Sequence, residues 1–420
     1  MISLTDFDGF TARRAIQLLA GNDRFTSSLG GSWVEGGAGN DTLIGLSGQD
    51  SFVGGLGEDS MNGGDGGDIY TVDAVDRVVD SGATGRDAII AMGGTYVLPN
   101  SIEDLLAGGG NIVGNGNYKA NYMSGGLGKD ALSGLAGADT LNGSRGDTLL
   151  GGTGDDTYVL NATVVQVVEA AGAGRDAVQT NLSSATLADN VEILRHLGTF
   201  AFVGTGNDAA NLIQSGDGAD TLRGLGGDDT LVGGGGANRL AGGTGDDTYV
   251  VTEATDVIVE LDGQGRDTVN TGLMTYVLPD FVENLQMTGN FTGLGSSATG
   301  NALDNTITGG ASAENLNGLD GNDFLSGMAG FDTLIGGLGN DTYRIDDDGN
   351  EQDLVIEAAL GGTDTILLKR YYYFMTDAAN VENLRSIYTG ATRVGGNDLD
   401  NRISTRDGAD TLTGKRGMTV

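Results

Sequence analysis

The chain has little of what usually stabilises or anchors a protein of its size. It contains no cysteine, one histidine, one tryptophan and two prolines among 420 residues. Without cysteine, no disulfide framework supports the fold. Scarce proline excludes collagen and proline-rich linkers, even though 77 residues are glycine. No apolar run is long enough to span a membrane, and the first residues do not form a basic, apolar secretory signal.

Positive charge is also scarce. Only 22 lysines and arginines oppose 58 aspartates and glutamates, which gives a formal net charge of −36. Such a charge disfavours binding to nucleic acid or to an anionic membrane surface. High charge with modest hydrophobicity is typical of disorder, so we expect folding to require neutralising cations.

The common catalytic signatures are missing as well. The sequence has no HExxH, no G-x-S-x-G and no phosphate-binding loop with its lysine. Carboxylates are abundant, but they lie in predicted turns, where they suit metal binding better than acid–base chemistry. We therefore expect a protein that is not an enzyme.

Glycine and aspartate instead recur in a strict pattern. Four blocks of nine residues follow one another from Gly36, and they read GGAGNDTLI, GLSGQDSFV, GGLGEDSMN and GGDGGDIYT. Each block has the form G-x-x-G-x-D-x-U-x, where U is apolar in all but the fourth block, which has Tyr70. Nonapeptides of this form are typical of calcium-binding parallel β-helices.

The spacing has a physical reason. Glycines at positions 1 and 4 allow positive φ and a sharp turn, which directs backbone carbonyls and the aspartate inward. Hard oxygen ligands of this kind suit Ca²⁺. Positions 7 to 9 then form a short strand whose apolar residue enters the core. Two blocks make one coil, so turns should stack 18 residues apart, with Asp41 facing Asp59 and Asp50 facing Asp68.

The pattern returns in four later clusters, which begin near residues 125, 215, 318 and 405. Degenerate turns precede the regular ones and carry asparagine in place of aspartate: Asn121, Asn211, Asn305 and Asn401. We expect these turns to bind no ion or to bind one weakly. Alternatively, their amides stack as a hydrogen-bonded ladder.

A longer period lies above the nonapeptides. The tyrosines that close the clusters are Tyr70, Tyr158, Tyr249 and Tyr343, which are 88, 91 and 94 residues apart. Repeats of about 90 residues indicate a solenoid built from larger units. The predicted division is a cap with the first cluster (1–71), three superrepeats (72–159, 160–250 and 251–344) and a partial superrepeat (345–420).

Segments between the clusters also resemble one another. They hold β-branched stretches, which predict strands, and they either continue the solenoid as irregular coils or form insertions on its flank. A GRD motif recurs at Gly85, Gly174 and Gly265, with GTD at Gly362; it predicts either a turn with a local Arg–Asp contact or an extra ion site. A VENL-type motif carries a glutamate that we expect to be structural. Residues 10–19 fit a short amphipathic capping helix.

These nonapeptides resemble the RTX (repeats-in-toxin) family of haemolysin-type calcium-binding repeats. The units of about 90 residues look like those of large bacterial RTX proteins, including surface-layer-like proteins and adhesins. The resemblance implies an all-β parallel β-roll, or β-helix solenoid, with multiple Ca²⁺ ions held between stacked turns. It also implies secretion by a type I system that reads an uncleaved C-terminal signal.

Carried over by position, the family's metal ligands fall on the aspartates of the regular turns. These are Asp41, Asp50, Asp59, Asp68, Asp130, Asp139, Asp156, Asp229, Asp247, Asp323, Asp332 and Asp341. Imperfect turns give four weaker candidates, Asp23, Asp147, Asp220 and Asp410. Asn238 weakens the site shared with Asp220, and Glu314 replaces the aspartate expected opposite Asp332.

The sequence therefore predicts an extracellular calcium-binding protein that folds on binding Ca²⁺ after export, with a surface-layer, adhesin or matrix role. The alternative is a non-catalytic RTX module of a larger secreted lipase, protease or polysaccharide epimerase. Calcium is the expected ligand, and a cell-surface polysaccharide or further copies of the chain are candidate partners.

Overall fold

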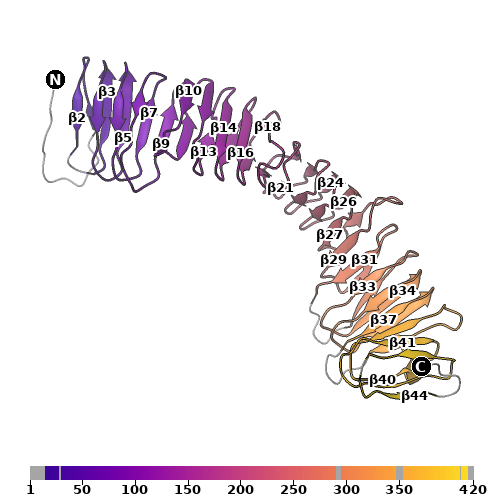
Figure 1. Ribbon diagram of the computed structural model, residues 1–420. Coiled ribbons are helices and arrows are strands. Elements are labelled where there is room, and N and C mark those ends of the chain that lie inside the picture. The colour runs from indigo at the N-terminus through magenta and orange to yellow at the C-terminus, as the bar shows by residue number, and fades with distance from the viewer. Residues whose placement is uncertain (1–14, 28–29, 290–294, 347–352, 407, 415–420) are drawn as a thin grey trace. The chain divides into compact units, whose positions relative to one another are not determined.

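The computed structural model describes residues 15–27, 30–289, 295–346, 353–406 and 408–414. The chain divides into two compact units, residues 1–198 and 199–420. Within the described residues, the one helical segment is a 3₁₀ turn, η1 (Met375–Asp377). All other regular elements are short strands, which pair in parallel. Each unit is thus a parallel β-solenoid (Figure 1), and the predicted all-β class is confirmed.

In the first unit each coil contributes one strand to a long parallel sheet. This sheet contains β1 (Ala15–Gln17), β3 (Trp33–Ala38), β5 (Ser51–Leu56), β7 (Ile69–Val72), β9 (Ala88–Ala91), β11 (Asp104–Ala107), β13 (Tyr122–Ser124), β15 (Thr140–Gly143), β17 (Thr157–Leu160), β19 (Ala177–Thr180) and β21 (Ile193–His196). The alternate strands form shorter sheets. One contains β2 (Arg24–Thr26), β4 (Thr42–Ile44), β6 (Ser60–Asn62) and β8 (Arg77–Val78), and the next contains β10 (Gly94–Val97), β12 (Ile112–Asn115), β14 (Ala131–Ala136), β16 (Thr148–Thr153) and β18 (Gln166–Val168); β20 spans Ser184–Thr186.

The second unit repeats this plan. Its long sheet contains β23 (Leu212–Gln214), β25 (Thr230–Val232), β27 (Thr248–Val251), β29 (Thr268–Thr271), β31 (Asn284–Met287), β33 (Thr306–Thr308), β35 (Phe324–Ser326), β37 (Thr342–Ile345), β39 (Thr365–Leu368), β41 (Asn383–Ser386) and β43 (Arg402–Ser404). The alternate strands are β22 (Val203–Thr205), β24 (Thr221–Gly226), β26 (Arg239–Thr244) and β28 (Val257–Ile258); then β30 (Thr275–Val277), β32 (Ser296–Thr299), β34 (Glu314–Asp320), β36 (Thr333–Leu338) and β38 (Leu354–Ile356); then β40 (Tyr372–Phe374), β42 (Arg393–Gly395) and β44 (Thr411–Thr413).

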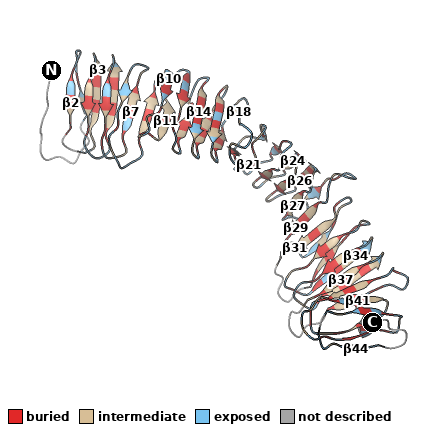
Figure 2. Cartoon of the chain, viewed as in Figure 1, coloured by how far each residue is buried: buried red, intermediate tan, exposed pale blue. Residues whose placement is uncertain are grey.

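Strand register follows the nonapeptide. Thr42 pairs with Ser60 and Ser51 pairs with Ile69, so consecutive turns of the first cluster stack 18 residues apart as predicted. The apolar residue of each block points into the core, and Phe52 and Tyr70, which lie next to each other, are fully buried. Figure 2 shows this buried stripe along the strands of each unit. The core is therefore a narrow column of stacked side chains.

The glycines act differently from our prediction. Positive φ occurs at positions 2 and 4 of the block, as at Gly37 (φ 100°) and Gly39 (φ 130°), and not at position 1. Gly36, at position 1, is needed for space instead. A Cβ there would lie 2.5 Å from the Asp41 Oδ2 atom and 2.5 Å from the Gly54 carbonyl oxygen. The first glycine of the block thus keeps open a place between two oxygens.

The segments between clusters continue the solenoid. β9 and β11 pair with each other and with β7 and β13 in the long sheet, and the corresponding strands do so in later repeats. On the opposite side the sheet is interrupted, because β8 and β10 belong to different sheets. The connecting segments are therefore irregular coils of the solenoid, and the alternative of insertions on its flank is wrong.

The predicted capping helix over residues 10–19 is also wrong for the part that the structure describes. Residues 15–17 form β1, and Ile16 pairs with Val34 of β3. The backbone amide of Leu18 donates to the carbonyl of Glu35 at 2.8 Å. β1 covers the edge of β3, and the two strands satisfy each other's backbone groups. A helix over the same residues would leave that edge of β3 unpaired. Residues 10–14 lie outside the described residues.

Candidate metal centre

One acidic or amide residue stands directly before almost every strand of the long sheets. We call this series the first column. In the first unit it contains Asp50, Asp68, Asp87, Glu103, Asn121, Asp139, Asp156, Asp176 and Glu192. In the second unit it contains Asn211, Asp229, Asp247, Asp267, Glu283, Asn305, Asp323, Asp341, Asp364, Glu382 and Asn401. Because successive strands pair in register, these side chains are stacked one coil apart.

A second column precedes the strands of the shorter sheets. Its acidic and amide members are Asp23, Asp41, Asp59, Asp76, Asp130 and Asp147 in the first unit, and Asp220, Asn238, Asp256, Glu314, Asp332, Asp353 and Asp410 in the second. The two columns together hold every aspartate that the sequence predicted as a metal ligand.

Within a column, each turn is hydrogen-bonded to the next through a carboxylate. The backbone amide of Asp41 donates to Asp59 Oδ1 at 2.7 Å, and that of Asp50 donates to Asp68 Oδ1 at 2.8 Å. The same bond joins Asp229 to Asp247 at 2.8 Å. The predicted facing pairs are therefore confirmed, and in each of these bonds a backbone amide holds one carboxylate oxygen of the next turn.

The other carboxylate oxygen has no such partner. The Oδ2 atoms of the following aspartates are buried and accept no hydrogen bond: Asp41, Asp59, Asp68, Asp130, Asp139, Asp156, Asp176, Asp220, Asp229, Asp247, Asp323, Asp332, Asp341 and Asp364. Burying an ionised oxygen without a partner is costly, so such groups either bind a cation or take up a proton. The repetition of this orphaned atom at equivalent positions indicates a ligand that is shared by the whole series.

At several blocks a second oxygen lies near the orphaned atom. The glycine at position 1 of a block keeps this place clear: a Cβ on Gly224 would meet the Asp229 Oδ2 atom and would lie 2.5 Å from the carbonyl oxygen of Gly242, one coil further on. Gly45 has the same relation to Asp50 and to the Gly63 carbonyl, also at 2.5 Å. A carboxylate oxygen and a carbonyl oxygen thus converge between adjacent turns. This donor set fits Ca²⁺, which binds oxygen ligands at about 2.3–2.6 Å.

Burial also alters the acidity of these groups. Loss of hydration raises the pKa of Asp229 and of Asp323 to about 7, and that of Asp332 to about 8. Neighbouring carboxylates, such as Asp247 beside Asp229, raise the pKa further. Without a cation the columns therefore hold protons near neutral pH, and a bound divalent ion would replace them.

The weaker candidates differ from the regular ones in the structure too. Both oxygens of Asp147 are occupied, because Oδ1 accepts from the Asp130 amide at 2.9 Å and Oδ2 from the Ser144 amide at 2.6 Å. Asp410 accepts from the backbone and hydroxyl of Thr392 at 2.7 and 2.8 Å. Asp23 begins its column by donating its amide to Asp41 Oδ1 at 2.7 Å. Asp147 and Asp410 thus have oxygens that the protein already satisfies, whereas Asp220 Oδ2 accepts no hydrogen bond, as in the regular turns.

Turns in which asparagine or glutamate replaces the aspartate still stack on the next turn, but they offer a different oxygen ligand. Asp220 donates its amide to Asn238 Oδ1 at 3.0 Å, so the amide takes the place of a carboxylate there. Glu314 donates its amide to Asp332 Oδ1 at 2.8 Å and therefore occupies the predicted position. At the degenerate turns, Asn121 Nδ2 donates to the carbonyl of Glu103 at 3.2 Å while its Oδ1 accepts from Asn117. These asparagines are hydrogen-bonded structural residues.

The sequence interpretation missed acids in the connecting segments. The aspartate of the GRD motif continues the first column: Asp87 Oδ1 accepts from the Asp68 amide at 2.7 Å, and Asp176 Oδ1 accepts from the Asp156 amide at 2.8 Å. The predicted local Arg–Asp contact is wrong, since Arg86 pairs with Asp104 at 2.5 Å and not with Asp87. Position directly before a strand is the sequence signal that could have identified these residues.

The glutamate of the VENL-type motif is structural, as expected. Glu192 Oε2 accepts from the Asp176 amide at 2.8 Å, and Glu283 Oε2 accepts from the Asp267 amide at the same distance. Each repeat of about 90 residues therefore carries one run of the first column, from an asparagine through aspartates to a glutamate. The glutamate ends the run of acids.

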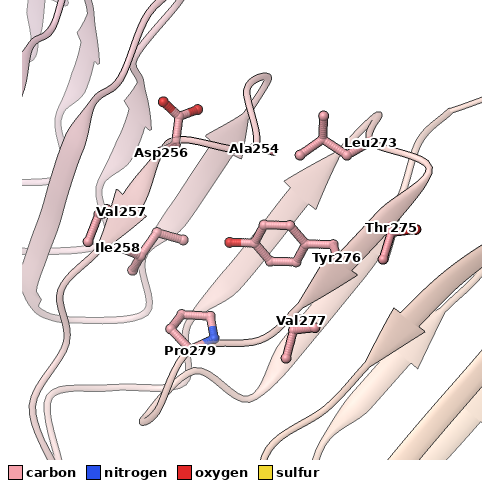
Figure 3. Close-up of a pocket in the computed structure, with 9 residues that line it drawn as sticks. All are labelled: Ala254, Asp256, Val257, Ile258, Leu273, Thr275, Tyr276, Val277 and Pro279. Atoms are coloured by element: carbon pink, nitrogen blue, oxygen red, sulfur yellow. The ribbon is translucent and has the colours of Figure 1, made fainter.

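A separate pocket lies in the second unit, between β28 and β30, which belong to different sheets. Figure 3 shows the Tyr276 ring across from Ile258, with Pro279 beside it. Among the residues that line the pocket, Asp256 is the one carboxylate, and its Oδ1 accepts from the Asn238 amide at 3.0 Å. The pocket is largely apolar and is a consequence of the interrupted sheet.

Comparison with known proteins agrees with the geometry. The family model of the RTX calcium-binding nonapeptide repeat matches residues 35–70, 115–148, 203–249 in two overlapping matches, and 299–344 in two more. These matches cover most of the nonapeptide turns whose aspartates enter the columns, and the chain carries the calcium-binding repeats of the RTX family. It is a calcium-binding repeat protein.

No curated protein matches the chain as a whole. Over the part of the chain that the structure describes, no helix has the length and apolar character needed to cross a bilayer.

Proposed function

We propose that this protein is an extracellular structural or interaction element whose folding is driven by Ca²⁺ after export. The observation that carries the proposal is the repeated pair of a buried, orphaned Asp Oδ2 atom and a glycine carbonyl of the next coil. In a low-calcium cytosol the carboxylates of the unfolded chain would stay charged and keep the chain expanded. Extracellular calcium modules have Kd values of roughly 10⁻⁴–10⁻³ M, which suits folding outside the cell.

The proposed role is a surface-layer, adhesin or matrix role, without catalysis. Each solenoid unit offers a surface of repeated coils, which suits contact with a polysaccharide or with further copies of the chain. The family's association with secretion supports an extracellular location and a type I export route. These assignments rest on the family and on the calcium-dependent fold.

The first test is a calcium titration of the chelator-treated protein, followed by far-ultraviolet circular dichroism, with Mg²⁺ as the control cation. We expect a cooperative gain of β-structure near millimolar Ca²⁺ and little response to Mg²⁺, which requires a smaller octahedral site. A chain that is fully folded in chelator, or that responds equally to Mg²⁺, would contradict calcium-driven folding.

A pair of neighbouring variants locates the effect. Asp229→Asn removes the charge of a buried ligand, and we expect the calcium midpoint to rise severalfold because ligand charge sets the affinity. Asp228→Asn changes an exposed carboxylate beside it and keeps the Oδ1 acceptor that bonds the Asp246 amide at 2.8 Å. The same titration should leave this control unchanged, and equal midpoints for the two variants would argue against the column.

A further inference from the structure

The last turn of a nonapeptide cluster differs from those before it. The next coil belongs to a connecting segment and has no position-1 glycine to offer its carbonyl. At Gly242, the hydroxyl of Tyr249 takes that place, 2.6 Å from where a Cβ would lie, and the Tyr158 hydroxyl does the same at Gly151. A standard site between two nonapeptide turns is therefore incomplete at the end of a cluster.

Three acids converge at this point in three of the clusters. We call them the closing triads: Asp156, Glu169 and Asp176; Asp247, Glu260 and Asp267; and Asp341, Glu357 and Asp364. In each triad one carboxylate oxygen from every member lies within 4.8 Å of the others. Two of the three acids come from the connecting segment and lie outside the nonapeptide pattern.

Each triad contains buried oxygens that nothing in the protein satisfies. The Oδ2 atoms of Asp156 and Asp176 accept no hydrogen bond, although these residues are only 1% and 0% exposed. The same holds for Asp341 Oδ2 and Asp364 Oδ2 in the third triad, and for Asp247 Oδ2 and Glu260 Oε2 in the second. Two carboxylates with buried, unsatisfied oxygens beside a third acid call for a divalent cation.

A tyrosine hydroxyl orients the glutamate of each triad. The Tyr249 hydroxyl accepts from the Gly242 amide at 2.7 Å and donates to Glu260 Oε1, which leaves Glu260 Oε2 facing the other acids. Tyr158 and Tyr343 donate in the same way to Glu169 and Glu357. Burial and the neighbouring glutamate raise the pKa of Tyr158, so its hydroxyl remains a donor.

We propose that the three closing triads are additional Ca²⁺ sites, each of which closes a nonapeptide cluster and binds more tightly than the sites between nonapeptide turns. Three carboxylates at one point supply a larger ligand charge than an aspartate and a carbonyl do, and ligand charge sets calcium affinity. The proposal rests on the proposed function only in taking Ca²⁺ as the cation.

The bound ion would also hold together an irregular coil. Asp156 and Asp176 are 20 residues apart, Asp247 and Asp267 also 20, and Asp341 and Asp364 are 23, against 18 in a regular coil. In the first two triads the additional residues form the loop that carries the glutamate, because β18 and β28 still pair 18 residues after β16 and β26. A cation between the three acids would fix this loop against the last nonapeptide turn.

The first cluster provides an internal comparison. Its equivalent acid is Asp80, which has a shorter side chain. Its Oδ1 accepts from the Tyr70 hydroxyl at 2.9 Å and its Oδ2 from the Gly82 amide at 3.2 Å, and both oxygens of Glu169 and of Glu357 are hydrogen-bonded as well. Asp68, Asp80 and Asp87 do not form a converging group of the kind found in the later clusters. We therefore expect three closing sites in the described chain.

The experiment counts bound ⁴⁵Ca²⁺ by equilibrium dialysis of the full chain. The variants are Glu260→Gln, the triple variant Glu169→Gln, Glu260→Gln, Glu357→Gln, and the matched control Glu253→Gln, which changes an exposed carboxylate near the same triad. We expect the single variant to lose one ion of the tightest class and the triple variant to lose three. The control should keep the wild-type count.

A second measurement covers the case in which the triple variant does not fold. Tb³⁺ replaces Ca²⁺, and emission sensitised by tyrosine reports ions close to Tyr249 and its counterparts. We expect the first equivalents of Tb³⁺ to give sensitised emission in wild type and Glu253→Gln, and less of it in Glu260→Gln.

The outcomes separate the two proposals. Wild-type counts and emission in Glu260→Gln would overturn the closing sites while leaving calcium binding by the nonapeptide turns in place. Absence of bound Ca²⁺ in the wild-type chain would overturn the proposed function as well. Loss of an equal number of ions in Glu253→Gln would show that the effect comes from net charge and would also overturn the assignment.

Discussion

At the scale of single residues, the columns depend on an unequal use of the two carboxylate oxygens. Oδ1 of Asp59 accepts the amide of Asp41, and Oδ2 accepts nothing. The hydrogen bond fixes the side chain in the folded coil, so the second oxygen is held where an ion would bind. The stacking of turns that forms the coil thus also forms the site, which couples ion binding to folding.

The glycine at position 1 should be intolerant of a side chain. We expect Gly224→Ala to destabilise the calcium-loaded fold by ~1–3 kcal/mol and to raise the calcium midpoint, because its Cβ would meet Asp229 Oδ2 and the Gly242 carbonyl oxygen. Thermal unfolding with and without Ca²⁺ measures both effects. Gly272→Ala is the control, since a Cβ there has nothing nearer than 4.0 Å. Similar losses in both variants would contradict the spatial argument.

In the absence of calcium, protons bound to the buried carboxylates should partly stabilise the fold. Burial raises the pKa of Asp229 to about 7 and that of Asp332 to about 8, whereas in the unfolded chain aspartate titrates near ~3.9. The metal-free fold therefore binds protons more tightly than the unfolded chain, so its stability is greatest at low pH and falls as the pH rises through about 7–8. In chelator we expect more β-structure at pH ~5 than at pH ~8.5.

Circular dichroism across this pH range, in chelator and in Ca²⁺, measures the effect. The calcium-loaded protein should show the opposite trend, because protons compete with the ion for the same oxygens. Asp332→Asn should weaken the pH dependence of the metal-free protein. Loss of β-structure on acidification in chelator would contradict this prediction.

At the scale of the element, each cluster needs a defined end. The regular coil is self-propagating, since each turn offers a carboxylate to the amide of the turn before it. The tyrosine that closes a cluster ends the series of glycine carbonyls, because its hydroxyl takes the place of one and binds an acid of the connecting coil. The bonds from amide to carboxylate continue beyond it, as from Asp247 to Asp267. Its apolar ring meanwhile continues the core stripe, fully buried at Tyr249.

Removing that hydroxyl should be costly. Tyr249→Phe leaves the Gly242 amide without its acceptor and Glu260 without its donor. We expect a loss of ~1–3 kcal/mol in the free energy of unfolding, which is typical of a buried polar group left unsatisfied. Chemical denaturation in Ca²⁺ measures it, with Tyr118→Phe, at a 65% exposed position, as the control. An unchanged stability would show that water satisfies both groups.

At the scale of the whole molecule, repulsion between negative charges opposes folding. Calcium has to relieve it at the buried carboxylate oxygens that accept no hydrogen bond. The chain carries a net charge of −36, and salt can screen only the exposed part of it. The orphaned oxygens are buried, where screening is weak, and they require a direct ligand. The two contributions can be separated by experiment.

We expect ~0.5 M NaCl in chelator to reduce the hydrodynamic radius slightly without restoring β-structure, because the screening length falls to a few ångströms but the buried oxygens stay unpaired. Millimolar Ca²⁺ should restore both. Light scattering and circular dichroism on the same samples measure the two properties. Full recovery of β-structure in NaCl would show that general repulsion, and not ion coordination, keeps the chain unfolded.

The sequence by itself determined the coil and most of its ligands. A nine-residue period with glycine and aspartate at fixed positions fixes where the chain turns, and parallel stacking then follows, as the pairing of Asp41 with Asp59 shows. The prediction of positive φ at positions 1 and 4 of the block was only partly right. Positive φ occurs at Gly37 and Gly39, whereas Gly36 provides space. Local pattern alone does not reveal which contacts a neighbouring coil makes.

Only the tertiary structure decided what the connecting segments do. The GRD motif and the strand after it mark Asp176 as a candidate, but nothing in the local sequence of Glu169 places it beside Asp156. Their position depends on the register of a coil with additional residues, which is set by pairing of β17 with β19 across 20 residues. Short-range pattern specifies the repeated turn, whereas contacts between unlike coils depend on how far each irregular coil extends before it returns to the sheet.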